Sequence, residues 1–288
     1  RLLRHAKTRT VIAMAHNVYY KDGKLARPND ERWPIYAVRG ANGSWGKVRK
    51  LEWDHPEASA IYTSNCSQRV ELPGGDVLVP LTHGPKGRAD RAVSTVRCSF
   101  DGEILRIRQH GAVLRCSVGR GLLEPSLAAL DGRIYLTIRA ENGQGFISAS
   151  ADGLDWQTMS PWMWDDGEPI EMSTTQQRWL PHSDGLFLVY TRKDATNRNV
   201  MRWRAPLWMA EVDRKKLRLI RATERVVIPM NADGVKHPGE VEHQGNFHTT
   251  AISASESLVS TGTVVPKTWR GAVRIARNRW NRPNGLVT

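Results

Sequence analysis

Residues 120–156 read RGLLEPSLAALDGRIYLTIRAENGQGFISASADGLDW, and this stretch predicts the fold. Two short apolar runs, 126–130 and 133–139, are joined by Asp131-Gly132, a dipeptide that supplies the positive φ angles of a tight hairpin. A second hairpin follows, with its turn at Asp152-Gly153. Short antiparallel strands packed so closely along the chain are typical of one blade of a β-propeller.

The same kinds of turn recur along the chain, so this blade is one of several. One series, with each turn followed by an apolar strand, comprises 7–10, Gly74-Gly75, Asp131-Gly132, Asp184-Gly185 and Ser255-Glu256. A second series interleaves with it and comprises Asn42-Gly43, Asp101-Gly102, Asp152-Gly153, Asp213-Arg214 and Arg277-Asn278. The period is about 55 residues, close to that of known propeller repeats. We therefore predict an all-β propeller of four-stranded antiparallel blades, formed as a single domain over 1–288.

Five repeats are visible, and we expect six blades. The sixth would be assembled from the C-terminal end and from sequence missing before Arg1, so the first blade is expected to be incomplete. The chain starts with Arg1 rather than Met, as the cut end of a longer product would. A signal peptide for secretion or for the periplasm would have been lost with that segment, so the localisation is left open. No apolar run reaches transmembrane length, which predicts no transmembrane segment.

Composition indicates an anionic partner. The formal net charge is +13 and the pI is about 10, mostly from arginine, whose planar fork suits carboxylates better than the lysine ammonium does. The basic residues are scattered over strands and turns without a compact helix or an aromatic nucleic-acid motif, so we predict no nucleic-acid partner. Three cysteines without CxxC spacing, Cys66, Cys98 and Cys116, favour buried thiols over a disulfide framework or a zinc site. We expect no metal and no cofactor.

The repeat itself predicts a polar site. Counting eight residues back from the turn in each of four repeats gives Ser67 (with Gln68 beside it), Glu124, Gln177 and His248. These positions should begin the innermost strands, whose ends face the axial funnel of a propeller. A carboxylate buried there costs several kcal/mol unless it is paired or solvated. The four residues therefore predict either a ligand site at the funnel mouth or a channel that holds only water.

Several phrases of the chain carry a family resemblance. Ser150-Ala-Asp152-Gly153-Leu-Asp-Trp156 resembles the Asp box, in which Ser, Asp and Trp lock the outer hairpin of a blade, although it is one residue shorter than usual. Together with SNCSQRVELPGGDVLVP, STTQQRW, LVYTRK and RWRAPLWMAEVD, it is similar to an uncharacterised bacterial branch of the sialidase (neuraminidase) superfamily. That resemblance covers most of the chain and implies a six-bladed propeller. Asp boxes also occur outside sialidases, so they speak for the fold more than for the activity.

The resemblance also implies roles for particular residues. Glu124 and Arg139 have the order and the spacing of the sialidase glutamate that polarises the nucleophile and of the second arginine that clamps the substrate carboxylate. For the third arginine, Arg204 is the best match, with Arg202 beside it and Arg192 in reserve. The first arginine is missing here, with Arg1 or Arg4 as substitutes, and Asp30 matches the acid of the family. Gln68 and Gln177 complete the expected substrate-binding residues. For a second acidic pair, Asp165-Asp166, two interpretations stay open. It forms a surface turn, or its two close carboxylates raise the pKa of one of them.

The nucleophile departs from the family pattern. Sialidases use a tyrosine late in the chain, whereas the last tyrosine here is Tyr190, and the matching segment reads Gly245-Asn246-Phe247-His248. A neutral histidine suits a base near neutral pH, so His248 would act on water or on a sugar C–H. Alternatively, another residue is the nucleophile, or the protein is not a catalyst.

Three hypotheses for the function follow from these residues. The first is a glycoside hydrolase of sialidase type that removes terminal acidic sugars such as sialic acid from glycans. The second is a propeller lyase or hydrolase acting on uronate-containing glycans, which the histidines and the lost tyrosine favour. The third is a non-catalytic glycan-binding propeller, which the incomplete arginine triad favours. In each case the expected partner is an acidic glycan, and the protein is expected to be a monomer.

Overall fold

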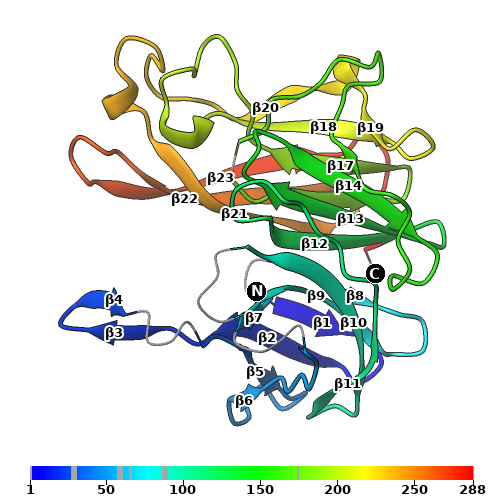
Figure 1. Cartoon of the computed structure of the whole chain (residues 1–288). Helices are drawn as coiled ribbons and strands as arrows, with labels where there is room; N and C mark the ends of the chain where they lie inside the picture. Colours follow the sequence, from blue (N-terminus) through cyan, green and yellow to red (C-terminus); the bar gives the residue numbers. More distant parts are fainter. Residues whose placement is uncertain are drawn as a thin grey trace. The chain divides into compact units, whose positions relative to one another are not determined.

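The computed structural model describes residues 2–26, 31–56, 61–64, 67–85, 90–173 and 175–287. Within these ranges the regular structure is almost entirely β-strand, as the sequence predicts (Figure 1). Helix is confined there to short 3-10 turns, η2 (Met201–Trp203), η3 (Arg221–Thr223) and η4 (Pro238–Glu240). No helix in the described part of the chain is long and apolar enough to cross a membrane.

The strands form successive antiparallel sheets, which are the blades of a β-propeller. The first blade contains β1 (Leu2–His5), β2 (Thr10–His16), β5 (Pro34–Arg39) and β6 (Arg49–Lys50). The second contains β7 (Ile61–Thr63), β8 (Val70–Glu71), β9 (Val77–Gly84), β10 (Ala92–Phe100) and β11 (Leu105–His110). The third contains β12 (Leu122–Leu130), β13 (Arg133–Ala140), β14 (Gly145–Ser150) and β15 (Ser160–Pro161).

The remaining strands complete two further blades and one hairpin. The fourth blade contains β16 (Arg178–His182), β17 (Gly185–Tyr190), β18 (Leu207–Asp213), β19 (Arg218–Leu219) and β20 (Arg225–Ile228). The fifth contains β21 (His243–Ser253), β22 (Glu256–Val264) and β23 (Gly271–Arg279). A separate hairpin pairs β3 (Tyr19–Lys21) with β4 (Lys24–Ala26).

The described strands build five blades, so the expectation of six is wrong. The first strand, β1, already pairs with β2 in the first blade. At the other end, the segment after β23 forms turns that attach to the β16–β17 turn instead of adding a strand. Asn284 is fully buried there, donating from Nδ2 to the Pro181 carbonyl (3.1 Å) and accepting the Ser183 N–H at Oδ1 (3.0 Å). The C-terminal residues are thus held against the fourth blade.

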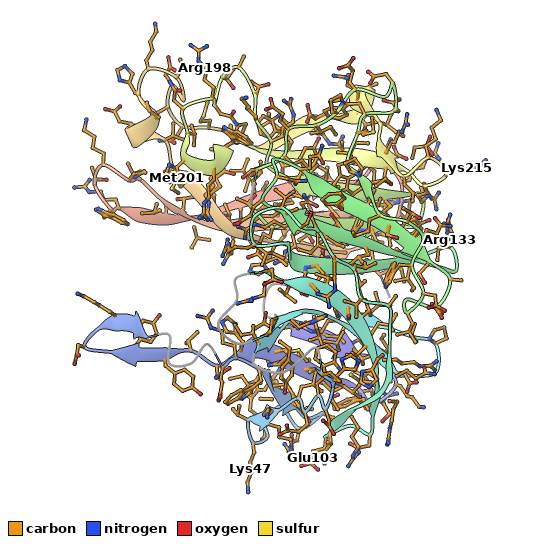
Figure 2. The ribbon with its side chains drawn as sticks, viewed as in Figure 1. Lys47, Glu103, Arg133, Arg198, Met201 and Lys215 are labelled. Carbon is orange, nitrogen blue, oxygen red and sulfur yellow. The ribbon has the colours of Figure 1, made fainter. Side chains whose placement is uncertain are left out.

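The chain divides into two compact units, each described by itself. Unit 1 comprises Arg1–Leu136 with Ala149–Gln157, and unit 2 comprises Thr137–Ser148 with Thr158–Thr288. The core of unit 1 is built from apolar side chains of the first two blades, among them Ile12, Tyr36, Leu51, Val79 and Val96. A core cluster of unit 2 joins the fourth and fifth blades through Leu180, Val189, Met209, Phe247 and Val259. Figure 2 shows side chains filling the space among the strands, while exposed ones lie on loops, such as Arg198 and Lys215, or on η2, such as Met201. The single domain expected from the repeats stays a prediction.

The hairpin of residues 149–157 is closed by side-chain to backbone hydrogen bonds. The Ser150 hydroxyl accepts the Gly153 N–H (2.8 Å), and Oδ1 of Asp152 accepts the N–H groups of Leu154 (2.8 Å) and Asp155 (3.0 Å). These N–H donors hold the pKa of the Asp152 carboxyl below its usual range. Trp156, in the same hairpin, is half-buried. The assignment of this hairpin as an Asp box stays a prediction.

We expect Asp152→Ala to lower the free energy of unfolding by about 1 kcal/mol, because both N–H bonds are lost but the site is solvated. Since the folded-state pKa of Asp152 is lowered, its contribution is present above the unfolded pKa and is lost as the pH falls through the lowered value. Urea denaturation at neutral pH and at pH near 3 measures both effects. Asp155→Ala removes a neighbouring exposed carboxylate and should change little. Equal losses in the two variants would contradict the role of Asp152.

Candidate functional site

One end of unit 2 gathers arginines, and we call it the arginine rim. It is the end at which β16 begins and β17 ends, because Arg178 pairs with Val189. Strand β21 lies beside β16 in the same direction: Gln176 Nε2 donates to the Phe247 carbonyl (3.0 Å), and Thr249 Oγ1 donates to the Trp179 carbonyl (2.6 Å). The start of β21 therefore belongs to the same rim.

Arg139 reaches this rim from β13 and is only 6% exposed. Thr137 lies two residues earlier, on the same face of the strand because side chains alternate. The Thr137 hydroxyl and the Trp162 indole N–H (3.2 Å) both donate to Oε1 of Gln177, which is 2% exposed. Thr137, Trp162 and Gln177 thus form a buried, hydrogen-bonded cluster, which we call the Thr137 wall. A carboxylate oxygen of Glu141 lies 3.6 Å from the Arg139 guanidinium. The rotamer freedom of Arg139 is therefore restricted before any ligand arrives.

The loop before β18 brings Arg204 to the rim. Asn197 is fully buried and fastens the loop, since its Nδ2 donates to the carbonyls of Arg192 and Ala205 (both 2.9 Å). The Arg204 carbonyl accepts the N–H of Gln244 on β21 (2.8 Å). Arg204 is half-buried, whereas Arg202 is exposed and accepts the Ser173 hydroxyl at its carbonyl. The preference for Arg204 over Arg202 as the ligand arginine stays a prediction.

His243 is a rim residue that the sequence argument missed. It begins β21 and is 7% exposed. Burial, and then the Arg204 charge, lower the pKa of its imidazole. A neutral imidazole beside an arginine can act as a base near neutral pH. Its signal in the sequence was weak, because His243 lies five positions before the turn-counted His248 in the same strand.

Arg192, the reserve candidate, lies at the end of β17 and already has carboxylate partners. The Arg192 guanidinium donates two hydrogen bonds to the Glu224 carboxylate (2.8 and 2.7 Å) and forms an ion pair with Asp194 (3.1 Å). The guanidinium carbon lies 4.6 Å from the centre of the Trp208 ring. Clamping a ligand carboxylate would require breaking this network.

Glu124 lies in unit 1, near the start of the inner strand β12, and has an unusual backbone. Its φ is +50°, a left-handed conformation that costs a non-glycine residue of order 1–2 kcal/mol. Its N–H donates to the Thr82 hydroxyl (3.1 Å) at the end of β9, and the residue is partly buried. Such strain is often found at functional sites. Thr82 was not singled out from the sequence, because only the fold brings β9 to β12.

Gln68 and His248 have different surroundings. Gln68 is 8% exposed, with Oε1 accepting the Ser126 hydroxyl (2.9 Å). In β21 a register shift between Ala251 and Ser253 adds a residue, so His248 pairs with Ser260. That pairing is equivalent to the Arg178–Val189 pair of the fourth blade, one residue away from the predicted equivalence with Gln177. His248 is exposed, unlike Arg178, while its neighbours Phe247 and Thr249 are buried.

The other sequence candidates lie away from the rim or outside the described residues. Asp30 and Cys66 are outside the described residues, as is Arg1, and Arg4 is exposed on β1. Asp166 forms an exposed ion pair with Arg221 (2.7 Å), and Asp165 accepts the Arg221 N–H (3.0 Å), which fits a surface turn. Burial raises the pKa of the Cys98 thiol to about 12.

A second group missed from the sequence is a histidine cluster around Trp53 in unit 1. The Trp53 indole N–H donates to Nδ1 of His110 (2.7 Å), and the rings of His55 and His83 lie 5.2 and 5.1 Å from the Trp53 ring. Burial, and then the nearby His55, lower the pKa of His110. Among the described residues, no group of three His, Cys, Asp or Glu side chains is arranged to hold a metal ion.

The comparisons with known proteins come from structure alone. No family model matches the sequence, and no curated protein matches it. The structure is similar to a protein of unknown function from Dyadobacter fermentans, with a TM-score of 0.62 and 15% identity over 96% of this chain and 74% of that chain. It is also similar to Trypanosoma rangeli sialidase in complex with sialic acid (TM-score 0.58, 12% identity, 93% of this chain, 42% of that chain).

A third likeness is to an α-L-arabinofuranosidase from Fusarium graminearum (TM-score 0.60, 10% identity, 96% of this chain and 91% of that chain). The chain spans less than half the length of the sialidase chain. At these identities the likeness concerns the fold, which is a β-propeller of the kind found in these glycoside hydrolases.

Proposed function

We propose that the protein is a glycoside hydrolase that removes a terminal acidic sugar, of the sialic acid type, from glycans. The observation that carries this proposal is Arg139, an arginine that is 6% exposed at the rim of unit 2, on the face of β13 that also carries the buried Thr137. A preorganised guanidinium recognises a carboxylate bidentately and loses little further freedom on binding. Arg204, half-buried on the same rim, adds a second cation. The glycosidase-like propeller and the net charge of +13 support the same substrate class.

The proposed catalytic carboxylate is Glu124, assigned as in sialidases to polarise the nucleophile. Its support is the strained backbone and the Thr82 hydroxyl that holds it, features that belong to unit 1 by itself. His248 and Asp30 keep their proposed roles as base and acid. We keep Arg202, Gln68 and Gln177 as proposed contributors to substrate binding. Gln177 belongs to the Thr137 wall.

A second candidate function is supported by His243. A lyase that acts on uronates needs a cation to neutralise the carboxylate and a base to remove the acidified C–H proton beside it. The neutral imidazole of His243 next to Arg204 has the chemistry of that pair. Release of free sialic acid from a fluorogenic sialoside supports the first function. An unsaturated product absorbing in the ultraviolet, formed from a polyuronate, supports the second.

Arg139→Lys tests carboxylate recognition. We expect it to weaken binding of sialic acid by roughly 10- to 100-fold, because lysine keeps the charge but loses the fork, a difference of about one charged hydrogen bond. Binding of a neutral sugar should change much less. Isothermal titration with both ligands measures the two losses.

The matched control is Arg133→Lys, which makes the same substitution at the other end of β13. It should leave both affinities unchanged. Equal losses for the acidic and the neutral ligand in Arg139→Lys would refute carboxylate recognition by this arginine.

A further inference from the structure

Unit 2 contains a cavity that begins at the β16–β17 turn, and we call it the turn-end pocket. It has a volume of about 660 Å³ and is lined by the β16–β17 turn, β18, the start of β20 and the segment after β23. His182, at the far end of β16 from the rim, is one of its walls. On its other side the lining includes Glu224, which bonds Arg192, and Arg225, which pairs with Met209 level with the Arg178–Val189 pair. Arg139, Arg204 and His243 do not line this cavity, so it is distinct from the group that those three residues form.

The walls of the turn-end pocket are held in place by hydrogen bonds of their own. His182 accepts the Asp184 N–H at Nδ1 (3.0 Å), so its proton is on Nε2, which donates to the Arg282 carbonyl (3.2 Å). Trp280 donates its indole N–H to the Ser257 hydroxyl (2.8 Å), and its ring lies 5.3 Å from Phe187. These bonds join the C-terminal segment to the fourth blade and preform the cavity, which favours ligand binding.

Two charged groups of the pocket keep their polar atoms available. Within the described ranges, the Glu211 carboxylate accepts no hydrogen bond and forms no ion pair, although the cavity lining includes it. The Glu211 backbone N–H donates to Thr223 Oγ1 (2.8 Å), which fixes the backbone from which the carboxylate extends. Arg225 is exposed over the Phe187 ring (6.0 Å) and pairs with no described carboxylate. An acceptor and a donor thus flank an aromatic surface.

The charges of the lining exclude a strong preference for ions. Three arginines, Arg225, Arg279 and Arg282, face three carboxylates, Asp184, Glu211 and Glu224, so the formal charges cancel. This differs from the arginine rim, where cations prevail. A neutral ligand with hydroxyl groups on its edge and an apolar C–H face matches a carboxylate, a guanidinium and an indole ring that is half-exposed. Those properties describe a neutral sugar.

We propose that the turn-end pocket is a second carbohydrate-binding site, which takes a neutral glycosyl unit. In it, Glu211 accepts hydrogen bonds from sugar hydroxyls, Arg225 donates to sugar oxygens, and the apolar face of the sugar lies on Trp280 and Phe187. The choice of a sugar as the ligand class rests on the proposed action on glycans. The pocket would hold a neutral part of a glycan whose acidic end is bound by Arg139 and Arg204.

Saturation-transfer NMR on the whole chain tests this site with neutral probes: the methyl glycosides of glucose, galactose, mannose and N-acetylglucosamine, and the disaccharides lactose and maltose. At least one should give a signal, and Glu211→Ala should weaken its binding by about tenfold or more. The Glu211 side chain makes no described bond, so this variant should fold with an unchanged melting temperature. Glu168→Ala, which removes an exposed carboxylate elsewhere in unit 2, should bind like the wild type.

The outcomes separate this inference from the proposed function. Neutral-sugar binding that survives Arg139→Ala and excess sialic acid but is lost in Glu211→Ala supports the pocket, even if no acidic sugar is ever released. Binding lost in Arg139→Ala and kept in Glu211→Ala overturns the pocket and leaves the rim. Absence of any signal from the neutral probes also overturns it. Displacement of the sugar by phenylalanine at lower concentration than by any glycoside would instead identify the pocket as an amino-acid site.

Discussion

Replacing Gly121 by alanine is expected to lower the free energy of unfolding by about 4 kcal/mol, from backbone strain together with a steric clash. Gly121 has a φ of +74°, and the segment 120–122 runs beside Arg91 as a parallel bridge. A Cβ there would overlap the Arg91 carbonyl oxygen and lie 2.9 Å from the Arg91 nitrogen. Moving the segment away would stretch two hydrogen bonds, Leu122 N–H to the Arg91 carbonyl (3.0 Å) and Arg91 N–H to the Arg120 carbonyl (2.8 Å).

Gly132→Ala separates the two causes. Gly132 has nearly the same φ, +70°, but nothing lies within 4 Å of the position a Cβ would take. It should therefore cost only the left-handed penalty, about 1–2 kcal/mol. Urea denaturation of both variants gives the two free energies. A Gly121 variant no less stable than the Gly132 variant would show that the close approach of 120–122 to Arg91 is not needed for stability.

Glu224→Ala is the other large expected effect, a loss of about 3 kcal/mol in the free energy of unfolding. The Glu224 carboxylate accepts two bonds from Arg192 and the Tyr190 hydroxyl (2.6 Å), and its side chain is 15% exposed. Burial, and then the Glu224 charge, raise the pKa of the Tyr190 phenol. Without the carboxylate, a largely buried guanidinium and a buried phenol lose their main partner, and desolvation of Arg192 is no longer compensated.

The exposed pair Lys267–Glu240 supplies the control. Its atoms lie at a similar distance, 2.9 Å, but the side chains are 66% and 48% exposed. Solvent screens such a pair, so Glu240→Ala should leave the unfolding midpoint unchanged. Thermal unfolding of the two variants side by side checks the difference. Should both variants unfold alike, burial would not be what gives the Arg192–Glu224 pair its strength.

The sequence predicted many of the local elements because short-range chemistry determines them. Asp131-Gly132 lies between β12 and β13 with positive φ at both residues, and Asp184 lies in the turn before Gly185, the first residue of β17. The turn predicted at Arg277-Asn278 is wrong, because both residues lie within β23. The period of these turns was enough to predict a propeller of antiparallel blades. It was not enough to count the blades, because the same terminal residues could form a further strand or attach to an existing turn, as Asn284 does.

For the candidate site too, some properties could be predicted from local sequence and others depend on the packed fold. Glu124 and Arg139 could be chosen from their spacing within one hairpin, but the positive φ of Glu124 and its bond to Thr82 depend on a strand far along the chain. His248 was placed by counting residues, and a one-residue bulge in β21 makes it equivalent to Arg178 instead of Gln177. Counting cannot detect a bulge, since it depends on how two strands pair.

The sequence by itself determined an all-β chain of repeated hairpins with a large positive charge, because turn chemistry, alternation and composition are local properties. The tertiary structure alone decided the surroundings of each arginine. Arg139 is buried on the face of β13 that carries Thr137, whereas the guanidinium of Arg192 is bonded to Glu224. Ion pairs and burial join residues distant in sequence, and their energies depend on distance and on the exclusion of water. Those quantities exist only once the strands are packed.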